Sequence, residues 1–178
     1  MAKYSNHKIR LFLQESDEAQ NSDEKGDKLE KLICYIFNKI PGVSFYGKNI
    51  LDGQRAHELD VVFVNILYKS DLIFLDPTMY VECKHTARPV GSDQVRWFID
   101  KLRDRAANSG ILVSLSGITG RQDRGSNAHS EVLNALVRDG IKIILIDREE
   151  LLSLSTTEDL KILIKGKFLK LTVERTII

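Results

Sequence analysis

Apolar residues recur at spacings of three and four in several parts of the chain, which predicts amphipathic helices. One such helix is expected over residues 22–40, capped by Asn21 or Ser22 and ended by Pro41-Gly42. Others are expected over residues 92–108 and before Gly140. The apolar positions of the first helix are Leu29, Leu32, Ile33, Ile36, Phe37 and Ile40.

Short apolar runs between these helices predict strands. Residues 111–115 are apolar at all but one position, which is typical of a strand buried on both faces. Residues 72–75 and 79–83 are expected to form one return strand, with a bulge or break at Pro77. A turn at 69–71 would pair it with the preceding strand. The other expected strands cover residues 43–46, 58–67 and 141–146.

The ends of the chain carry weaker patterns. Residues 1–21 are polar and fit either a short helix or a mobile arm. Asp147 and Glu150 form a capping-box pattern that predicts a short helix after the strand at 141–146. After residue 155 we expect a helix to about Lys165 and a last strand with Leu169, Leu171 and Val173.

The order of elements is therefore helix, three strands, helix, strand, helix, strand. Strands separated by helices favour parallel neighbours, and the early hairpin favours antiparallel ones. We expect an α/β fold with one mixed sheet and helices on both faces. The division of the chain would be an arm at 1–21, a core at 22–154 and an extension of the same domain at 155–178.

Composition narrows the class of protein. Of the 178 residues 43% are hydrophobic and the net charge is +1, which excludes a disordered chain. The apolar runs are too short to span a membrane, and the first residues do not form a signal sequence, so we expect a cytoplasmic protein without membrane contact. Cys34 and Cys83 fit reduced thiols in such a compartment.

Two acidic residues and a lysine stand out in the expected strands. Asp60 lies within an apolar strand, and Glu82 and Lys84 share one side of the return strand because side chains alternate along a strand. If the strands pair, Asp60 and Glu82 lie almost opposite each other and would repel without a cation between them. Mg²⁺ is held in proteins by one or two carboxylates with water and phosphate.

Lys84 beside such an ion would stabilise a pentacovalent phosphate, or position or deprotonate an attacking water. Glu30 on the first helix would supply a further carboxylate, with Glu24 as an alternative, and Glu58 shares the strand side of Asp60. The competing interpretation is an ordinary exposed pair of Glu82 and Lys84 at a strand end.

Further segments extend this pattern across the chain. They are Gly26-Asp27-Lys28-Leu29-Glu30, Glu58-Leu59-Asp60, Val81-Glu82-Cys83-Lys84, Val90-Gly91, Gln94 and the run from Gly110 to Gly117.

Together these segments resemble the PD-(D/E)xK nuclease superfamily and, within it, the Mrr-like restriction endonuclease domains, over roughly residues 23–146. The resemblance implies a restriction-endonuclease-like core of αβββαβ type. It implies that Asp60, Glu82 and the backbone carbonyl of Cys83 bind the metal, with Glu30 as an accessory ligand. Lys84 would be the catalytic lysine and Gln94 an active-site polar group. The usual proline before the aspartate is absent, because Leu59 precedes Asp60.

The net charge hides an uneven distribution. Residues 84–124 hold eight basic and four acidic side chains, whereas residues 1–30 hold five basic and seven acidic ones. The basic stretch could contact phosphates, although a solvated helix face would also explain the charges near Arg96. Trp97 and Phe98 are expected in the core. The candidate nucleic-acid contacts are His85, Arg88, Arg96, Arg121 and Arg124.

The sequence thus predicts a Mg²⁺-dependent endonuclease, with Mn²⁺ as a substitute, that hydrolyses DNA phosphodiesters through a metal-activated water. Its substrate would be double-stranded DNA, and its state a homodimer, because cutting two strands needs two sites. The resemblance implies a setting in prokaryotic defence, restriction or DNA processing. No small-molecule cofactor is expected. The alternatives are a Holliday-junction resolvase or an RNase of the same fold, and a non-catalytic nucleic-acid-binding module.

Overall fold

A computed structural model describes residues 1–51, 58–120 and 128–177. The strands are β1 (Val43–Leu51), β2 (Glu58–Asn65), β3 (Thr78–Lys84), β4 (Ser109–Ser114) and β5 (Lys142–Ile146). The helices are α1 (Asn6–Glu18), α2 (Ser22–Phe37), α3 (Leu67–Ser70), α4 (Ser92–Arg103), α5 (Ala128–Asp139), α6 (Arg148–Ser153) and α7 (Thr157–Leu169), followed by a π-helix, η1 (Lys170–Glu174).

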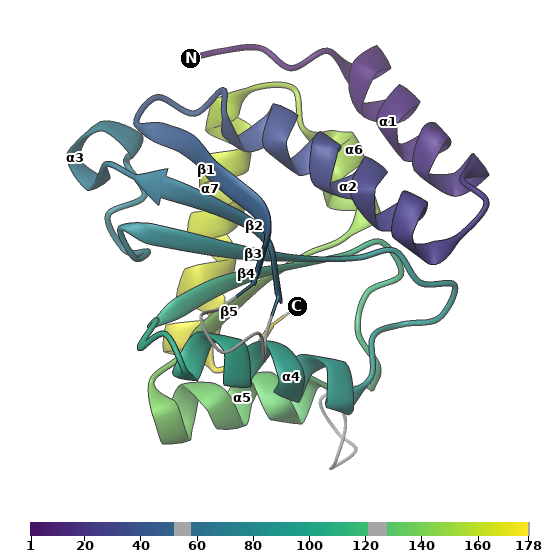
Figure 1. Cartoon of the computed structure of the whole chain (residues 1–178). Helices are drawn as coiled ribbons and strands as arrows, with labels where there is room; N and C mark the ends of the chain where they lie inside the picture. The colour runs from purple at the N-terminus through teal and green to yellow at the C-terminus, as the bar shows by residue number, and fades with distance from the viewer. Residues whose placement is uncertain (52–57, 121–127, 178) are drawn as a thin grey trace.

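The strands form one sheet in the order β1-β2-β3-β4-β5 (Figure 1). The first three strands pair antiparallel, and β3, β4 and β5 run parallel. In the β2–β3 pair Val61 lies opposite Val81 and Val62 opposite Tyr80, so the next positions along the strands bring Asp60 beside Glu82. The predicted α/β fold with a mixed sheet is confirmed.

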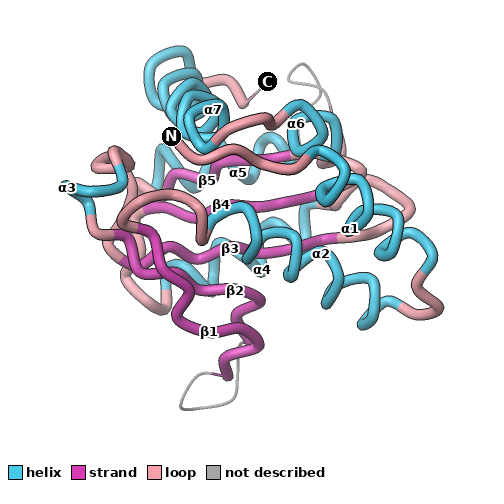
Figure 2. Tube along the Cα trace, turned by 90° about the horizontal axis from the view of Figure 1, so that it is seen from above, coloured by secondary structure: helices cyan, strands magenta, loops and turns pink. Residues whose placement is uncertain are grey.

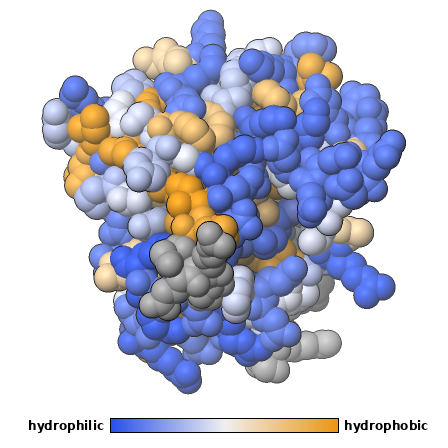
Figure 3. All heavy atoms as spheres, in the orientation of Figure 1, coloured by the Kyte–Doolittle hydropathy of each residue, from blue (hydrophilic) through white to orange (hydrophobic). Residues whose placement is uncertain are grey.

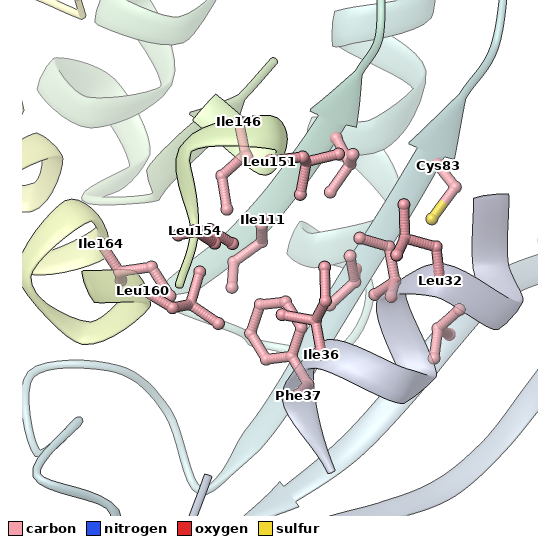
Figure 4. Close-up of a cluster of buried hydrophobic side chains, with 14 of the residues drawn as sticks. Leu32, Ile36, Phe37, Cys83, Ile111, Ile146, Leu151, Leu154, Leu160 and Ile164 are labelled. Atoms are coloured by element: carbon pink, nitrogen blue, oxygen red, sulfur yellow. The ribbon is translucent and has the colours of Figure 1, made fainter. Parts of the chain in front are cut away.

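Helices cover both faces of the sheet. One face carries α1, α2 and α6, the other carries α4 and α5, and α7 runs along the β5 edge (Figures 1 and 2). The larger core joins α2, the sheet, α6 and α7, where side chains such as Phe37, Ile111 and Leu160 meet (Figure 4). The smaller core lies between the sheet and the α4–α5 layer. Both buried layers hold the strand ends in place.

Local signals set the bounds of α2. The side chain of Asn21 accepts a hydrogen bond from the backbone N–H of Glu24 at 2.9 Å, which satisfies one of the free donors at the helix start. After the helix, Gly42 has a φ of +82°, and a Cβ there would come within 2.6 Å of the Lys69 Cβ atom. The predicted cap at Asn21 is confirmed, whereas the helix ends at Phe37, three residues before the predicted end at residue 40.

The N-terminal residues form a packed helix, the first of the two alternatives that the sequence left open. Ile9 and Leu13 of α1 are buried in the larger core, and Tyr4 donates a hydrogen bond to the Ile36 carbonyl at 3.1 Å. Lys3 also forms a bridge with Thr156 just before α7. Residues 1–21 are therefore tied to both sides of the core.

The return strand is shorter than predicted. Residues 72–75 lie in a turn after α3, and β3 begins only at Thr78. Leu72 is nevertheless fully buried, and its carbonyl accepts a hydrogen bond from the Asn65 side chain at 3.2 Å. The apolar run at 72–75 thus packs into the core without forming a strand. The side-chain amide of Asn65 bonds to its backbone in place of the hydrogen bonds between paired strands.

The predicted final strand is wrong. The chain passes Gly166 within α7 and then forms η1, so it stays helical to Glu174. Leu171 is buried and Val173 is exposed. Buried positions at Leu160, Ile164 and Leu171 follow spacings of four and seven, which is the helical period. The alternation of Leu169, Leu171 and Val173 was too short to distinguish a strand from a helix end.

Two surface properties follow from this arrangement. The hydrophilic side chains dominate over α1, α2 and α4, whereas hydrophobic ones gather over β1 and β2 (Figure 3). Among the described residues, the helices are too short or too polar to cross a membrane. Cys34 and Cys83 are both free thiols, as predicted.

Candidate active site

Several of the predicted site residues meet where β2 starts and β3 ends. A cleft of about 480 Å³ opens there, between α2 and the sheet. Its walls include Asp27 and Glu30 from α2, Glu58 and Asp60 from β2, and Lys84 and His85 at the end of β3. The register of the hairpin and the packing of α2 on the sheet therefore bring together residues more than 50 positions apart.

Asp60 lies inside this cleft and is held by the neighbouring strand. Its Oδ2 atom accepts a hydrogen bond from the backbone N–H of Cys83 at 2.7 Å. Burial, and then the nearby charge of Glu82, raise the pKa of Asp60 from 3.8 to about 6. An ionised Asp60 is thus costly in the protein alone, and a cation beside it would lower that cost.

Glu82 is buried beneath the cleft, with 1% of its surface exposed. Its Oε1 atom lies 2.8 Å from Lys84 Nζ. Lys101 Nζ, from α4 on the opposite face of the sheet, lies 2.9 Å from Oε1 and 2.8 Å from Oε2. Two ammonium groups therefore surround one carboxylate.

Sequence reasoning missed Lys101 as a site residue and counted it only as a basic charge. Lys101 is 4% exposed, three residues after the buried Phe98 and next to the buried Leu102. That spacing places it on the sheet-facing side of α4. A charged residue within the apolar stripe of a helix was the signal that could have found it.

Lys84 bridges the buried carboxylate and the cleft. Burial lowers its pKa, but the charges of Glu82 and Asp60 outweigh this and raise the pKa above its ordinary value. Its side chain is still partly exposed. Lys84 is therefore an ammonium ion that can donate to a phosphate, which favours charge stabilisation over deprotonation of water.

Glu30 faces the same cleft from α2 and is paired with Lys48 of β1, whose Nζ lies 3.3 Å from Oε2. Burial raises the pKa of Glu30, while Lys48 opposes the rise. Lys48 also contacts Asp27, one helical turn before Glu30. Asp27 belongs to the segment from Gly26 to Glu30, but the resemblance implies no role for it. Its hydrogen bonds with Lys31 and Lys48 lower its pKa.

The two alternative carboxylates differ in position. Glu24 caps the start of α2, where its side chain accepts hydrogen bonds from Gln20 and Asn21, and it does not line the cleft. Glu58 lies at the start of β2 and lines the cleft. Of the two helix residues proposed for this role, Glu30 lines the cleft and Glu24 does not.

Gln94 lies in the first turn of α4, beside Lys84 but outside the cleft. With Lys84, Asp93 and Trp97 it lines a neighbouring depression of about 440 Å³. Its Oε1 atom is 3.4 Å from the backbone N–H of Gly91. Phe98 is buried as predicted, but Trp97 is 52% exposed, because the buried stripe of α4 follows Val95, Phe98 and Leu102.

His85 is engaged by α1. Its Nδ1 atom lies 2.6 Å from the Ser16 hydroxyl, and its Nε2 atom 3.2 Å from Asp17 Oδ1. Arg148 holds Asp17 in turn, through contacts of 2.6 and 3.0 Å. Both ring nitrogens thus have partners within the protein. Any contact between His85 and nucleic acid would therefore have to involve the ring carbons.

The other predicted nucleic-acid contacts lie away from the cleft or outside the described residues. Arg88 is exposed on the loop after β3, where its carbonyl accepts hydrogen bonds from Thr86 and Ser116. Arg96 is paired with Asp93 and with Glu131 of α5 on the outer surface of α4. Arg121 and Arg124 lie outside the described residues.

The donor set at the cleft fits a hard divalent cation. Asp60, Glu82 and the Cys83 carbonyl offer oxygen atoms only, which Mg²⁺ and Mn²⁺ prefer. Burial is the main cause of the raised pKa of Asp60, and a cation beside this carboxylate would offset the cost of ionising it there. In the part of the chain that the structure describes, His, Cys, Asp and Glu side chains form no preassembled group of three or more for a metal.

A family model described as "Restriction endonuclease" (Mrr_cat) matches residues 22–155. No curated protein and no solved structure matches the chain. The match covers α2 to α6 and includes Asp60, Glu82 and Lys84, whereas α1 lies before it. Such domains generally use divalent metals and act on nucleic acid. With three quarters of its length matched in this way, the chain belongs to the Mrr-type restriction endonuclease family of nucleases.

Proposed function

We propose that this protein is a Mg²⁺-dependent endonuclease that hydrolyses phosphodiester bonds of double-stranded DNA. The observation that carries the proposal is the position of Lys84 Nζ, 2.8 Å from Glu82 and beside Asp60 at the edge of an open cleft. Two carboxylates with an ammonium group beside them suit a site that binds a cation and a phosphate together.

Each residue has a separate task in this proposal. Asp60, Glu82 and the Cys83 carbonyl would hold Mg²⁺, or Mn²⁺ in its place, and Glu30 would add a carboxylate from α2. When bound, the ion supplies Lewis acidity and lowers the pKa of water. Lys84 donates a hydrogen bond to a non-bridging phosphate oxygen and so stabilises the charge that develops there. Gln94, next to Lys84, orients the substrate.

The surroundings of the cleft bear on the substrate. Asp27, Glu30 and Glu58 make its wall acidic, so a polyanion would approach with its charge offset by the metal and Lys84. Arg88 would contact the backbone beyond the cleft, and Arg121 and Arg124, which lie outside the described residues, would contact further phosphates. A homodimer would provide the two sites that a double-strand cut requires. We place the activity in prokaryotic defence or DNA processing.

The test is cleavage of supercoiled plasmid DNA with Mg²⁺ or Mn²⁺, with EDTA and with Lys84→Ala as controls. We expect nicked and linear products with the metal, none with EDTA, and cleavage at least about 10³-fold slower in Lys84→Ala. Thermal melting of the variant checks that it is folded. Cleavage that survives EDTA or the substitution would contradict the mechanism.

The rival functions can be separated in the same experiment. Branched DNA and RNA substrates, tested beside linear duplex DNA, distinguish a junction resolvase and an RNase from the proposed enzyme. DNA binding by a folded wild-type protein without cleavage of any substrate would favour the non-catalytic module.

A further inference from the structure

We propose that Lys101 is a resident counter-ion of the metal centre: its ammonium neutralises Glu82 in the metal-free protein and opposes the divalent cation, and so sets the ion concentration that the site requires. This inference rests on the proposed function, because it concerns the binding of the ion to Asp60 and Glu82. Lys101 would act through Glu82, as a positioning residue.

The contacts of Lys101 are directed at one carboxylate. Its Nζ atom lies 2.8 and 2.9 Å from the two Glu82 oxygens, and both side chains are almost fully buried. Its element, α4, contributes no other lysine or arginine to the buried layer. A buried lysine is rare unless it is paired, so the position is built around Glu82.

The number of acceptor positions allows the ion and Lys101 to share Glu82. A carboxylate oxygen accepts about two hydrogen bonds. Among the residues that the structure describes, Oε1 receives both Lys84 and Lys101, whereas Oε2 receives Lys101 alone. One acceptor position on Oε2 therefore remains for a cation, and Lys101 need not leave when the cation binds.

The charges show why Lys101 would oppose that cation. Asp60 and Glu82 carry two negative charges, and Lys84 and Lys101 carry two positive ones, so the group is neutral before an ion arrives. Without Lys101 the group would carry a charge of −1. A unit charge about 6 Å from a divalent ion changes its affinity about tenfold even at the dielectric constant of water, and more in a buried site.

A merely structural role makes the opposite prediction. If Lys101 only holds Glu82 in place, its loss would disorder the carboxylate and weaken ion binding. Lys161 of α7 offers a control away from the cleft, because its Nζ lies 2.8 Å from a carboxylate oxygen of Asp71 and 2.8 Å from one of Glu158. Its loss removes a doubly paired lysine without touching Glu82.

The experiment is calorimetric titration of Mn²⁺ into the full-length, EDTA-treated and dialysed protein without DNA. We compare the wild type with Lys101→Met, Lys101→Gln and Lys161→Met. Both Lys101 variants are expected to bind Mn²⁺ at least about tenfold more tightly, and to gain more thermal stability from Mn²⁺ than the wild type does. Lys161→Met is expected to bind as the wild type does.

The outcomes separate the inference from the proposed function. Equal or weaker Mn²⁺ binding by folded Lys101 variants overturns the inference and leaves the nuclease proposal standing. Variants that stay unfolded even with saturating Mn²⁺ also overturn it, because Lys101 is then a structural residue. The proposed function itself is overturned if the wild-type protein binds no Mn²⁺, or if the Asp60→Asn variant binds Mn²⁺ as tightly as the wild type does.

Discussion

The candidate site has two halves that contain the same chemical groups in different surroundings. The buried half consists of Glu82 and Lys101, the open half consists of Asp27, Glu30 and Lys48, and Lys84 joins Glu82 to the cleft. Lys101 has 5% of its side chain exposed and Lys48 has 30%. Charges in the buried half therefore interact through a less polarisable medium and are screened less by salt.

This difference teaches which ion pairs matter for function. The Lys48–Glu30 contact is 3.3 Å long and lies at the cleft wall, where water and salt weaken it. The contacts of Glu82 are shorter and lie beneath the cleft floor. We therefore expect a change of the carboxylate in the first setting to have a small effect, and a change of the one in the second to affect both folding and the proposed chemistry.

The largest effect is expected from Glu82→Gln. The loss of one of the two principal carboxylates should slow DNA cleavage by about 10³-fold or more and weaken Mn²⁺ binding in calorimetry. The amide also leaves Lys101 without its counter-charge, which costs about 3–5 kcal/mol of stability for a buried pair. Melting curves measure that cost.

The double variant Glu82→Gln with Lys101→Met separates the two consequences. It removes both charges and should recover part of the stability while cleavage stays low. Recovery of cleavage together with stability would show that Glu82 only supports the fold.

An intermediate effect is expected from Asp60→Asn on the stability of the metal-free protein. A pKa raised from 3.8 to about 6 means that Asp60 contributes stability below about pH 4 that is lost as the pH rises through 6. The neutral amide removes that loss. In EDTA, Asp60→Asn should be up to about 3 kcal/mol more stable than the wild type at pH 8, with the gain shrinking towards pH 4.

Denaturant unfolding of both proteins at pH 4.5, 6 and 8 measures this difference. A variant that is equally or less stable at pH 8 would show that Asp60 is well compensated in the metal-free protein. Addition of Mg²⁺ at pH 8 should favour the wild type, because the ion binds the carboxylate and not the amide.

The smallest effect is expected from Glu30→Gln in the open half. We expect a loss of cleavage rate of about tenfold and little change in melting temperature, because Glu30 reaches the cleft from the side and its partner Lys48 is partly solvated. Plasmid cleavage rates at several Mg²⁺ concentrations measure it. A loss as large as that of Glu82→Gln would make the two halves equivalent.

Much of the site was predictable because its signals are local. Asp60 interrupts an apolar strand, and Glu82 and Lys84 alternate on another, so the pairing of two adjacent strands was enough to place them together. The cap at Asn21 and the turn at Gly42 are likewise indicated by local sequence signals. The mixed sheet followed from the order of these elements.

What could not be predicted depends on contacts between distant elements. Lys101 contacts Glu82 from α4, which covers the face of the sheet opposite α2. The residues next to Lys101 in the sequence do not indicate that partner. Trp97 and Phe98 are adjacent aromatic residues, yet a step of about 100° around the helix buries one and exposes the other. The engagement of His85 by α1 joins segments whose roles looked unrelated.

That engagement affects how the protein can be shortened. The family match begins at residue 22, but Ser16 and Asp17 hold the histidine directly after Lys84, and Arg148 depends on Asp17 for its ion pair. A fragment trimmed to residues 22–155 would lose α1 and with it the contacts that hold His85 at the end of β3. The packed unit around β3 is therefore larger than the stretch that the family model matches.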